Sequence, residues 1–128
     1  MATATQQVHR FSLPLSGIDN LSDAELDRLY EAGCDDATIG CTAGEWSAEF
    51  DREAPSLAEA VLSAVRDVEA ARVEGLAVEG VKPDEPDDLA EADLAAIAYL
   101  DALLRARRLA SRVPKVRELV GRMLAEVV

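Results

Sequence analysis

The fold is decided by residues 33–69, GCDDATIGCTAGEWSAEFDREAPSLAEAVLSAVRDVE, because the hydrophobic period of this stretch changes midway. In the first half apolar residues alternate, so that Trp46, Ala48 and Phe50 fall on one face of a strand. In the second half they recur at helical spacing and share one stripe, which consists of Leu57, Val61, Val65 and Val68. The stretch therefore predicts a β-hairpin that leads into a helix packed on the sheet.

The residues before this stretch predict a strand and a helix. Alternation of apolar and polar residues from Phe11 to Leu15 is typical of a strand. A helix is expected to begin at Ser22, whose hydroxyl can form a capping box with Glu25. Gly33 is expected to end this helix, because glycine adopts the left-handed conformation of a helix cap at low cost.

The remaining elements complete an α+β order. The hairpin strands are expected at residues 37–42 and 46–50, and a fourth strand at residues 76–81, after a helix capped by Ser56. The order βαββαβ is that of a ferredoxin-like domain, an antiparallel sheet with two helices on one face. We therefore predict an α+β fold in which residues 1–81 form this domain.

The rest of the chain is predicted to be a linker and a helical tail. Residues 82–88, KPDEPDD, form an acidic linker with two prolines. Residues 89–128 carry two apolar stripes separated by Pro114, so we expect a helical hairpin whose first helix is capped by Asp88 and reaches about Arg112. Such stripes seek a partner surface, and the predicted protein-binding interface consists of Leu100, Leu104, Val116, Val120, Met123 and Val127.

The net charge of the chain changes sign near residue 90, close to the start of the predicted tail. Residues 1–90 hold 20 acidic and 6 basic residues, a net charge of −14, and residues 91–128 hold 5 acidic and 7 basic residues, a net charge of +2. The acidic part would repel a phosphate backbone. Only the tail could approach DNA, through Arg105, Arg107, Arg108, Arg112, Lys115, Arg117 and Arg122.

Two interpretations of these basic residues remain open. Arginines near a helix C-terminus are favoured by the helix dipole, and nearby acidic surface offers internal partners, so the residues can be structural. Alternatively, a dimer could pair two basic tails and bind DNA as a transcription regulator. A third interpretation, in which the acidic surface mimics DNA and binds a basic protein, rests on net charge alone.

No pattern in the sequence predicts an enzyme or a cofactor. Cys34 and Cys41 fit neither a redox pair nor a zinc site, and His9 is the sole histidine, so free thiols and no metal are expected. The adjacent Asp35 and Asp36 are interpreted as a solvated turn, and the glycine-rich motifs of nucleotide sites are absent. No small-molecule substrate is indicated. With no long apolar run and no apolar core near the N-terminus, the chain is expected to be cytoplasmic and not membrane-bound.

Part of the chain resembles a known family. The segments GCDDATIG, FDREAPSLAEAVLSAVRDVE and PDDLAEADLAAIA are similar to a family of small bacterial DNA-binding regulators that carry a helix-turn-helix after an αβ domain. The resemblance covers roughly residues 8–98. It implies the family's amino-terminal domain, which in the family is followed by a bihelical unit that enters a major groove of DNA.

The chain departs from that family after residue 98. DLAAIA, residues 93–98, matches the start of the helix-turn-helix, but YLDALLRARRLASRVP follows without a glycine or turn signal before Ser111. The DNA-reading unit is therefore expected to be missing or replaced. We expect a non-enzymatic regulatory or adaptor protein that binds another protein or forms a homodimer through its carboxy-terminal helices, with DNA binding through the basic tail as the alternative.

Overall fold

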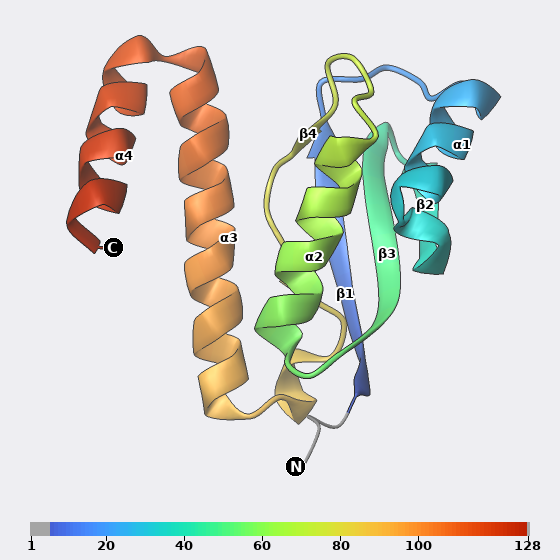
Figure 1. Cartoon of the computed structure of the whole chain (residues 1–128), viewed down its shortest axis with the longest axis horizontal. Coiled ribbons are helices and arrows are strands. Elements are labelled where there is room, and N and C mark those ends of the chain that lie inside the picture. The colour runs from blue at the N-terminus through green and yellow to red at the C-terminus, as the bar shows by residue number, and fades with distance from the viewer. Residues whose placement is uncertain (1–5, 128) are drawn as a thin grey trace.

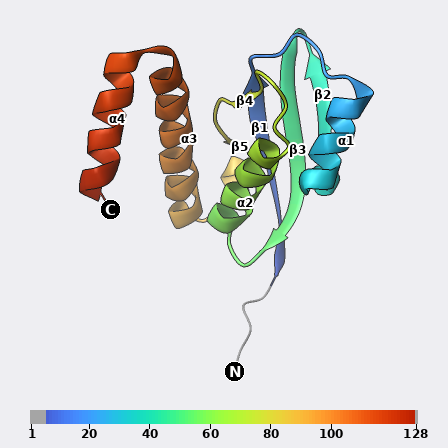
Figure 2. The same ribbon diagram turned by 45° about the horizontal axis from the view of Figure 1, so that its top comes forward.

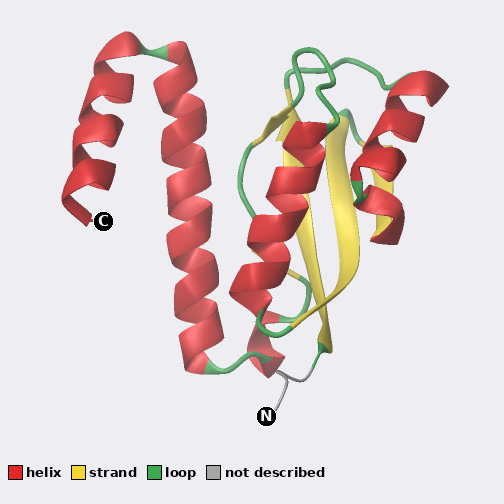
Figure 3. Ribbon diagram, in the orientation of Figure 1, coloured by secondary structure: helices red, strands yellow, loops and turns green. Residues whose placement is uncertain are grey.

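The computed structural model describes residues 6–127, with all of their side chains except those of residues 116, 117, 120, 124, 126 and 127. Figure 1 shows a sheet with helices on one side and a helical hairpin beyond them. Figure 3 shows the same arrangement coloured by secondary structure. The α+β class with an antiparallel sheet is confirmed, as is the helical hairpin after it.

The sheet is antiparallel throughout. Its long strands are β1 (Gln7–Ser16) and β3 (Glu45–Ala54), and β2 (Ala37–Thr42) lies outside β3. The order is β2-β3-β1-β4, where β4 is Ala77–Val78, and β5 (Lys82–Pro83) also pairs with β1. The hairpin turn lies at Ala43–Gly44, between the strands predicted at residues 37–42 and 46–50, and both residues have positive φ, the conformation that tight hairpin turns require.

Two helices cover one face of the sheet, as Figures 1 and 2 show. Helix α1 (Asp23–Ala32) begins with the predicted capping box between Ser22 and Glu25 and ends at Gly33, where φ is 125°. A single 3-10 turn, Cys34–Asp36, then leads into β2. Helix α2 (Leu57–Ala70) has Ser56 as its N-cap, and its predicted stripe is buried.

The core lies between these helices and the inner face of the sheet. The rings of Phe11 and Phe50, paired across β1 and β3, stack with their centroids 5.4 Å apart. Ala48 and Ala54 are buried on the same face of β3 as Phe50, which confirms the predicted alternation and extends it beyond residue 50. Arg52, which occupies the same face, is the buried charged residue of the described part of the chain.

The predicted fourth strand, residues 76–81, is wrong in its extent. Only Ala77–Val78 forms β4, and the chain pairs with β1 again at Lys82–Pro83, within the segment predicted to be a linker. The physical reason is that the N–H of Val81 donates to Oδ1 of Asp101, at 2.9 Å, instead of to a strand. Gly80 permits this approach, because a Cβ there would lie 2.2 Å from the same carboxylate oxygen.

The tail forms two helices. A 3-10 turn, Pro86–Asp88, precedes α3 (Glu91–Arg112), whose N-cap is Ala90, so the predicted cap at Asp88 is wrong. Val113 separates α3 from α4 (Pro114–Val127), and the two helices lie side by side in Figures 1 and 2. Helix α3 also packs beside α2. Ile97 and Leu104 of α3 belong to the same core cluster as the sheet residues, so apolar packing crosses the predicted linker.

Candidate functional site

The structure describes the side chains of three of the six predicted interface residues. Leu104 is 9% exposed and belongs to the core, and Leu100 is half-buried against the core. Met123 is 56% exposed on α4. The side chains of Val116, Val120 and Val127 lie outside the described residues.

Other apolar side chains of the tail are exposed. On α4, Leu119 is 53% exposed and lies one helical turn before Met123, so the two share one side of the helix. Further exposed apolar residues of the hairpin are Tyr99, Leu109 and Val113. The hydrophobic spacing of residues 114–128 also places Leu119 on the same stripe as Met123, although Leu119 is not among the predicted interface residues. The sequence could not show which apolar residues of the tail would be covered when α3 packs against its neighbours.

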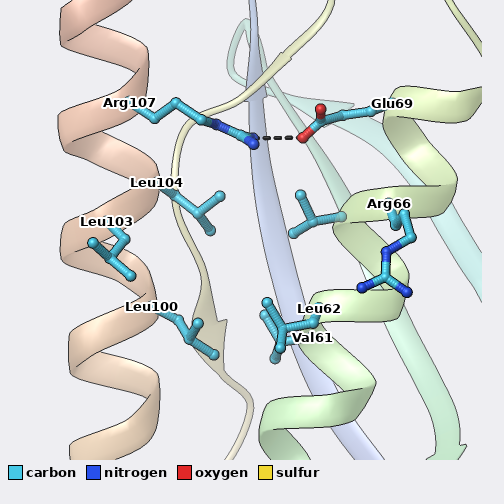
Figure 4. Close-up of a pocket in the computed structure, with 9 residues that line it drawn as sticks. Val61, Leu62, Arg66, Glu69, Leu100, Leu103, Leu104 and Arg107 are labelled. Atoms are coloured by element: carbon cyan, nitrogen blue, oxygen red, sulfur yellow. Dashed lines mark hydrogen bonds and ion pairs between the residues drawn. The ribbon is translucent and has the colours of Figure 1, made fainter. Parts of the chain in front are cut away.

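An apolar groove of about 360 Å³ lies between α2 and α3 (Figure 4). Its apolar lining comes from both helices and consists of Val61, Leu62, Val65, Leu100, Leu103 and Leu104. The Nη2 of Arg107 lies 2.5 Å from Oε1 of Glu69, and this ion pair joins the two helices beside the groove. Leu62 is 47% exposed and was not singled out from the sequence.

Four of the seven predicted DNA-contacting residues form ion pairs within the chain. Arg105 pairs with Asp101 of the same helix at 2.9 Å, and Arg107 pairs with Glu69 of α2. Arg108 and Arg112 both approach Oε1 of Glu79, at 3.0 and 3.2 Å. Lys115 and Arg122 are exposed on α4, and the side chain of Arg117 lies outside the described residues.

The Glu79 cluster fixes the C-terminal half of α3 to the sheet. Glu79 accepts hydrogen bonds from Ser16 of β1 and from Arg108, and the N–H of Glu79 donates to the carbonyl of Pro14. The pKa of Glu79 is lowered, first by the hydrogen bond from Ser16 and then by the arginines, against the opposing effect of burial. The carboxylate is therefore stabilised in its charged form, and this arrangement favours the structural interpretation of the arginines.

A second polar cluster surrounds Arg52, 7% exposed on β3. Its guanidinium donates to both carboxylate oxygens of Asp36, at 2.8 and 2.9 Å, and to Asp67 at 2.8 Å. It also donates to the carbonyl of Gly33 and to the hydroxyl of Ser63, and it lies 5.0 Å from the centre of the Phe50 ring. The pKa of Arg52 is raised, chiefly by the hydrogen bond to Asp36. These contacts join β3, α2 and the turn after α1, so we assign the cluster a structural role.

The sequence analysis missed Arg52 although a signal was present. Extending the alternation of Trp46, Ala48 and Phe50 by one step places residue 52 on the core face. An arginine there requires acidic partners within hydrogen-bond reach. Asp36, interpreted as part of a solvated turn, is one of them, and its side chain is 29% exposed.

The two cysteines are free thiols, as predicted. Cys34 is buried, and burial raises its pKa to about 11, with a further contribution from the nearby charge of Asp67. A thiol of that pKa is uncharged at neutral pH and is a poor nucleophile. Cys41 is exposed on β2. Over residues 6–127 no three His, Cys, Asp or Glu side chains are grouped closely enough to hold a metal ion.

Comparisons with models of protein families, with curated proteins and with solved structures found no match. None of the helices described between residues 6 and 127 is both long enough and apolar enough to cross a membrane.

Proposed function

We propose that this chain is a non-enzymatic regulatory or adaptor protein that acts by protein–protein binding or self-association through its carboxy-terminal helices. The observation that supports the proposal is the pair of exposed apolar residues on α4, Leu119 and Met123, each more than half exposed. Exposed apolar side chains that adjoin one another on a helix are typical of binding surfaces. The simplest partner is a second copy of the chain, as in a homodimer.

The proposal includes a scaffold and a location. The antiparallel order β2-β3-β1-β4, with two helices on one face, supports a ferredoxin-like βαββαβ domain as the scaffold that carries the hairpin. An experimental structure with another strand order would contradict this. A cytoplasmic location, with no cofactor and no small-molecule substrate, completes the proposal, and detection of the protein in a membrane or secreted fraction would contradict that location.

Self-association can be tested with a double substitution on α4. We expect Leu119→Ser combined with Met123→Ser to weaken the dimer by about tenfold, because two apolar anchors are lost from the interface. Sedimentation equilibrium between roughly 1 and 100 µM would measure the dissociation constant. Ala125→Ser, at an exposed position of the same helix, is the matched control. A double variant that dimerises as tightly as the wild type would contradict a role of α4 in self-association.

DNA binding by the basic tail, as in the helix-turn-helix regulators that the sequence resembles, is the alternative proposal. A phosphate would have to compete with Asp101, Glu69 and Glu79 for the paired arginines. Gel-shift titration at low salt distinguishes the two functions. Retardation that weakens steeply as salt rises would support the alternative, and the absence of retardation would contradict it.

A further inference from the structure

Helix α2 has, besides its buried face, a row of solvent-exposed residues that includes a large apolar side chain. Glu59, Leu62, Arg66 and Glu69 are exposed and follow one another at intervals of three and four residues, so they share one side of the helix. Leu62 is 47% exposed although it lies among residues of a well-packed helix. Figure 4 shows Leu62 and Arg66 from this helix at the edge of the α2–α3 groove. We call Glu59, Leu62 and Arg66 the α2 stripe.

The α2 stripe continues into an apolar surface. The groove beside Leu62 is floored by residues that are fully or largely buried, among them Val61, Val65 and Leu104, and its rim on α3 includes the half-buried Leu103. An exposed leucine next to an apolar hollow provides both a projection and a recess. A surface that provides both can be complementary to itself, as a two-fold interface requires.

We propose that α2 forms a two-fold symmetric, antiparallel contact with α2 of a second copy, with Leu62 at the symmetry axis and each copy's Leu62 resting on the other's α2–α3 groove. The proposal rests on the capacity for self-association proposed above. It adds a contact on α2 to the one proposed for the exposed residues of α4.

Charge complementarity selects the second copy as the occupant. At 1.5 Å per residue, Glu59 lies about 4.5 Å from Leu62 along the helix in one direction and Arg66 about 6 Å in the other. Antiparallel pairing about Leu62 therefore brings Glu59 of each copy within about 1.5 Å, along the axis, of the level of Arg66 of the other. The symmetry repeats this pair, so two ion pairs flank the central leucines.

The same charges disfavour the parallel arrangement. In a parallel pair related by a two-fold axis along the helices, Arg66 would face Arg66 and Glu59 would face Glu59, and like charges placed together repel. Each copy also carries a net charge of −12, so the copies repel one another except where a local arrangement of opposite charges offsets this. The α2 stripe offers that arrangement in the antiparallel orientation only.

Charge reversal tests the register directly. We expect Glu59→Arg alone and Arg66→Glu alone each to raise the dimer dissociation constant at least about tenfold, because each variant faces its own copy with like charges. Mixing the two single variants should restore a dimer, since one copy then offers two arginines where the other offers two glutamates. The double variant Glu59→Arg/Arg66→Glu should dimerise like the wild type. Sedimentation equilibrium measures the dimer dissociation constant of each single variant, of their mixture and of the double variant.

Two controls keep the outcome interpretable. Leu62→Asp should abolish the dimer while circular dichroism shows an unchanged helix content, because Leu62 is half exposed and its loss spares the core. Glu69→Arg lies outside the predicted pairs and should weaken the dimer less than Glu59→Arg.

The failure of this inference differs from the failure of the proposed function. A dimer that survives all three substitutions of the α2 stripe but dissociates in the Leu119→Ser/Met123→Ser variant overturns the α2 contact and supports self-association through α4. A dimer that dissociates in the variants of the α2 stripe but survives in the Leu119→Ser/Met123→Ser variant supports the α2 contact. Two single variants that fail to dimerise when mixed overturn the antiparallel register. A wild-type protein that is monomeric at about 100 µM overturns both self-association proposals.

Discussion

Arg52 shows how one buried charge can be accommodated by a small domain. Its guanidinium has acceptors on three sides, namely Asp36, Asp67 and the carbonyl of Gly33. Over the described residues no buried side-chain polar atom lacks a hydrogen-bond partner. The desolvation cost of the charge is therefore offset by charge-assisted hydrogen bonds, and removing the arginine alone would leave its partners uncompensated.

We predict that Arg52→Met lowers the free energy of unfolding by about 3 kcal/mol, because Asp36 and Asp67 lose their shared cation in a partly buried site. Urea denaturation measures the change. The matched control is Arg10→Met, which breaks the ion pair between Arg10 of β1 and Asp51 of β3, where both side chains are about two-thirds exposed. That variant should lose less than about 1 kcal/mol. Equal losses in the two variants would contradict the structural role of Arg52.

Helix α3 contacts the domain through an apolar side chain near its N-terminus and through ion pairs near its C-terminus. Ile97 is buried in the core near the beginning of the helix, whereas the last turns are held by Glu79 through Arg108 and Arg112. This explains why the extent of the fourth strand could not be predicted. The segment from Glu79 to Val81 bonds side chains of α3, and the sequence pattern of a strand carries no information about a helix that arrives later in the chain.

We predict that Glu79→Gln loosens the C-terminal half of α3. Amide hydrogen exchange of residues 105–112 should accelerate about tenfold, because the charge-assisted bonds to Arg108 and Arg112 are weakened, while exchange near Ile97 should stay unchanged. Glu74→Gln, an exposed residue in the loop before β4, is the control. Uniform acceleration along α3, or none, would contradict the prediction.

The same carboxylate gives a pH dependence with a defined sign. The pKa of Glu79 is lower in the folded protein than its ordinary value of 4.5, so its contribution to stability is fully present above pH 4.5 and is lost as the pH falls below that value through the folded pKa. The difference in unfolding free energy between wild type and Glu79→Gln should therefore shrink on acidification. A difference that grows as the pH falls would contradict the sign.

Over the whole molecule, local signals were sufficient to predict the order of the elements from β1 to α2. Three features are set by residues near one another in the chain, namely the capping box at Ser22, the turn at Ala43–Gly44 and the buried apolar face of α2. Each lies where the sequence predicted it. The candidate surfaces were predictable only in part. Exposure of Leu62 and burial of Leu104 both depend on how α3 packs against α2, which is a long-range contact.

Packing across residues 82–88 predicts cooperative unfolding of the sheet and α3. Leu104→Ala should destabilise the protein by about 2 kcal/mol, since a core side chain beside the α2–α3 groove is truncated. The single tryptophan, Trp46, reports on β3, and far-ultraviolet circular dichroism reports mainly on the helices. Both midpoints should fall together, and Leu109→Ala, at an exposed position of the same helix, should leave them unchanged. A fluorescence midpoint that does not move would indicate two independently folding domains.

Strand β2 has a consequence for colloidal behaviour. It ends the strand order of the described sheet, and its six residues, ATIGCT, carry no charge and no proline. Its outward N–H and C=O groups can template a strand from another molecule, and what keeps molecules apart is the net charge of −12. Turbidity should therefore rise as acidification neutralises the carboxylates. Compared with the wild type at the same net charge, Thr38→Lys, which places a cation on the edge strand, should precipitate less. Equal precipitation of the two proteins would show that it begins elsewhere.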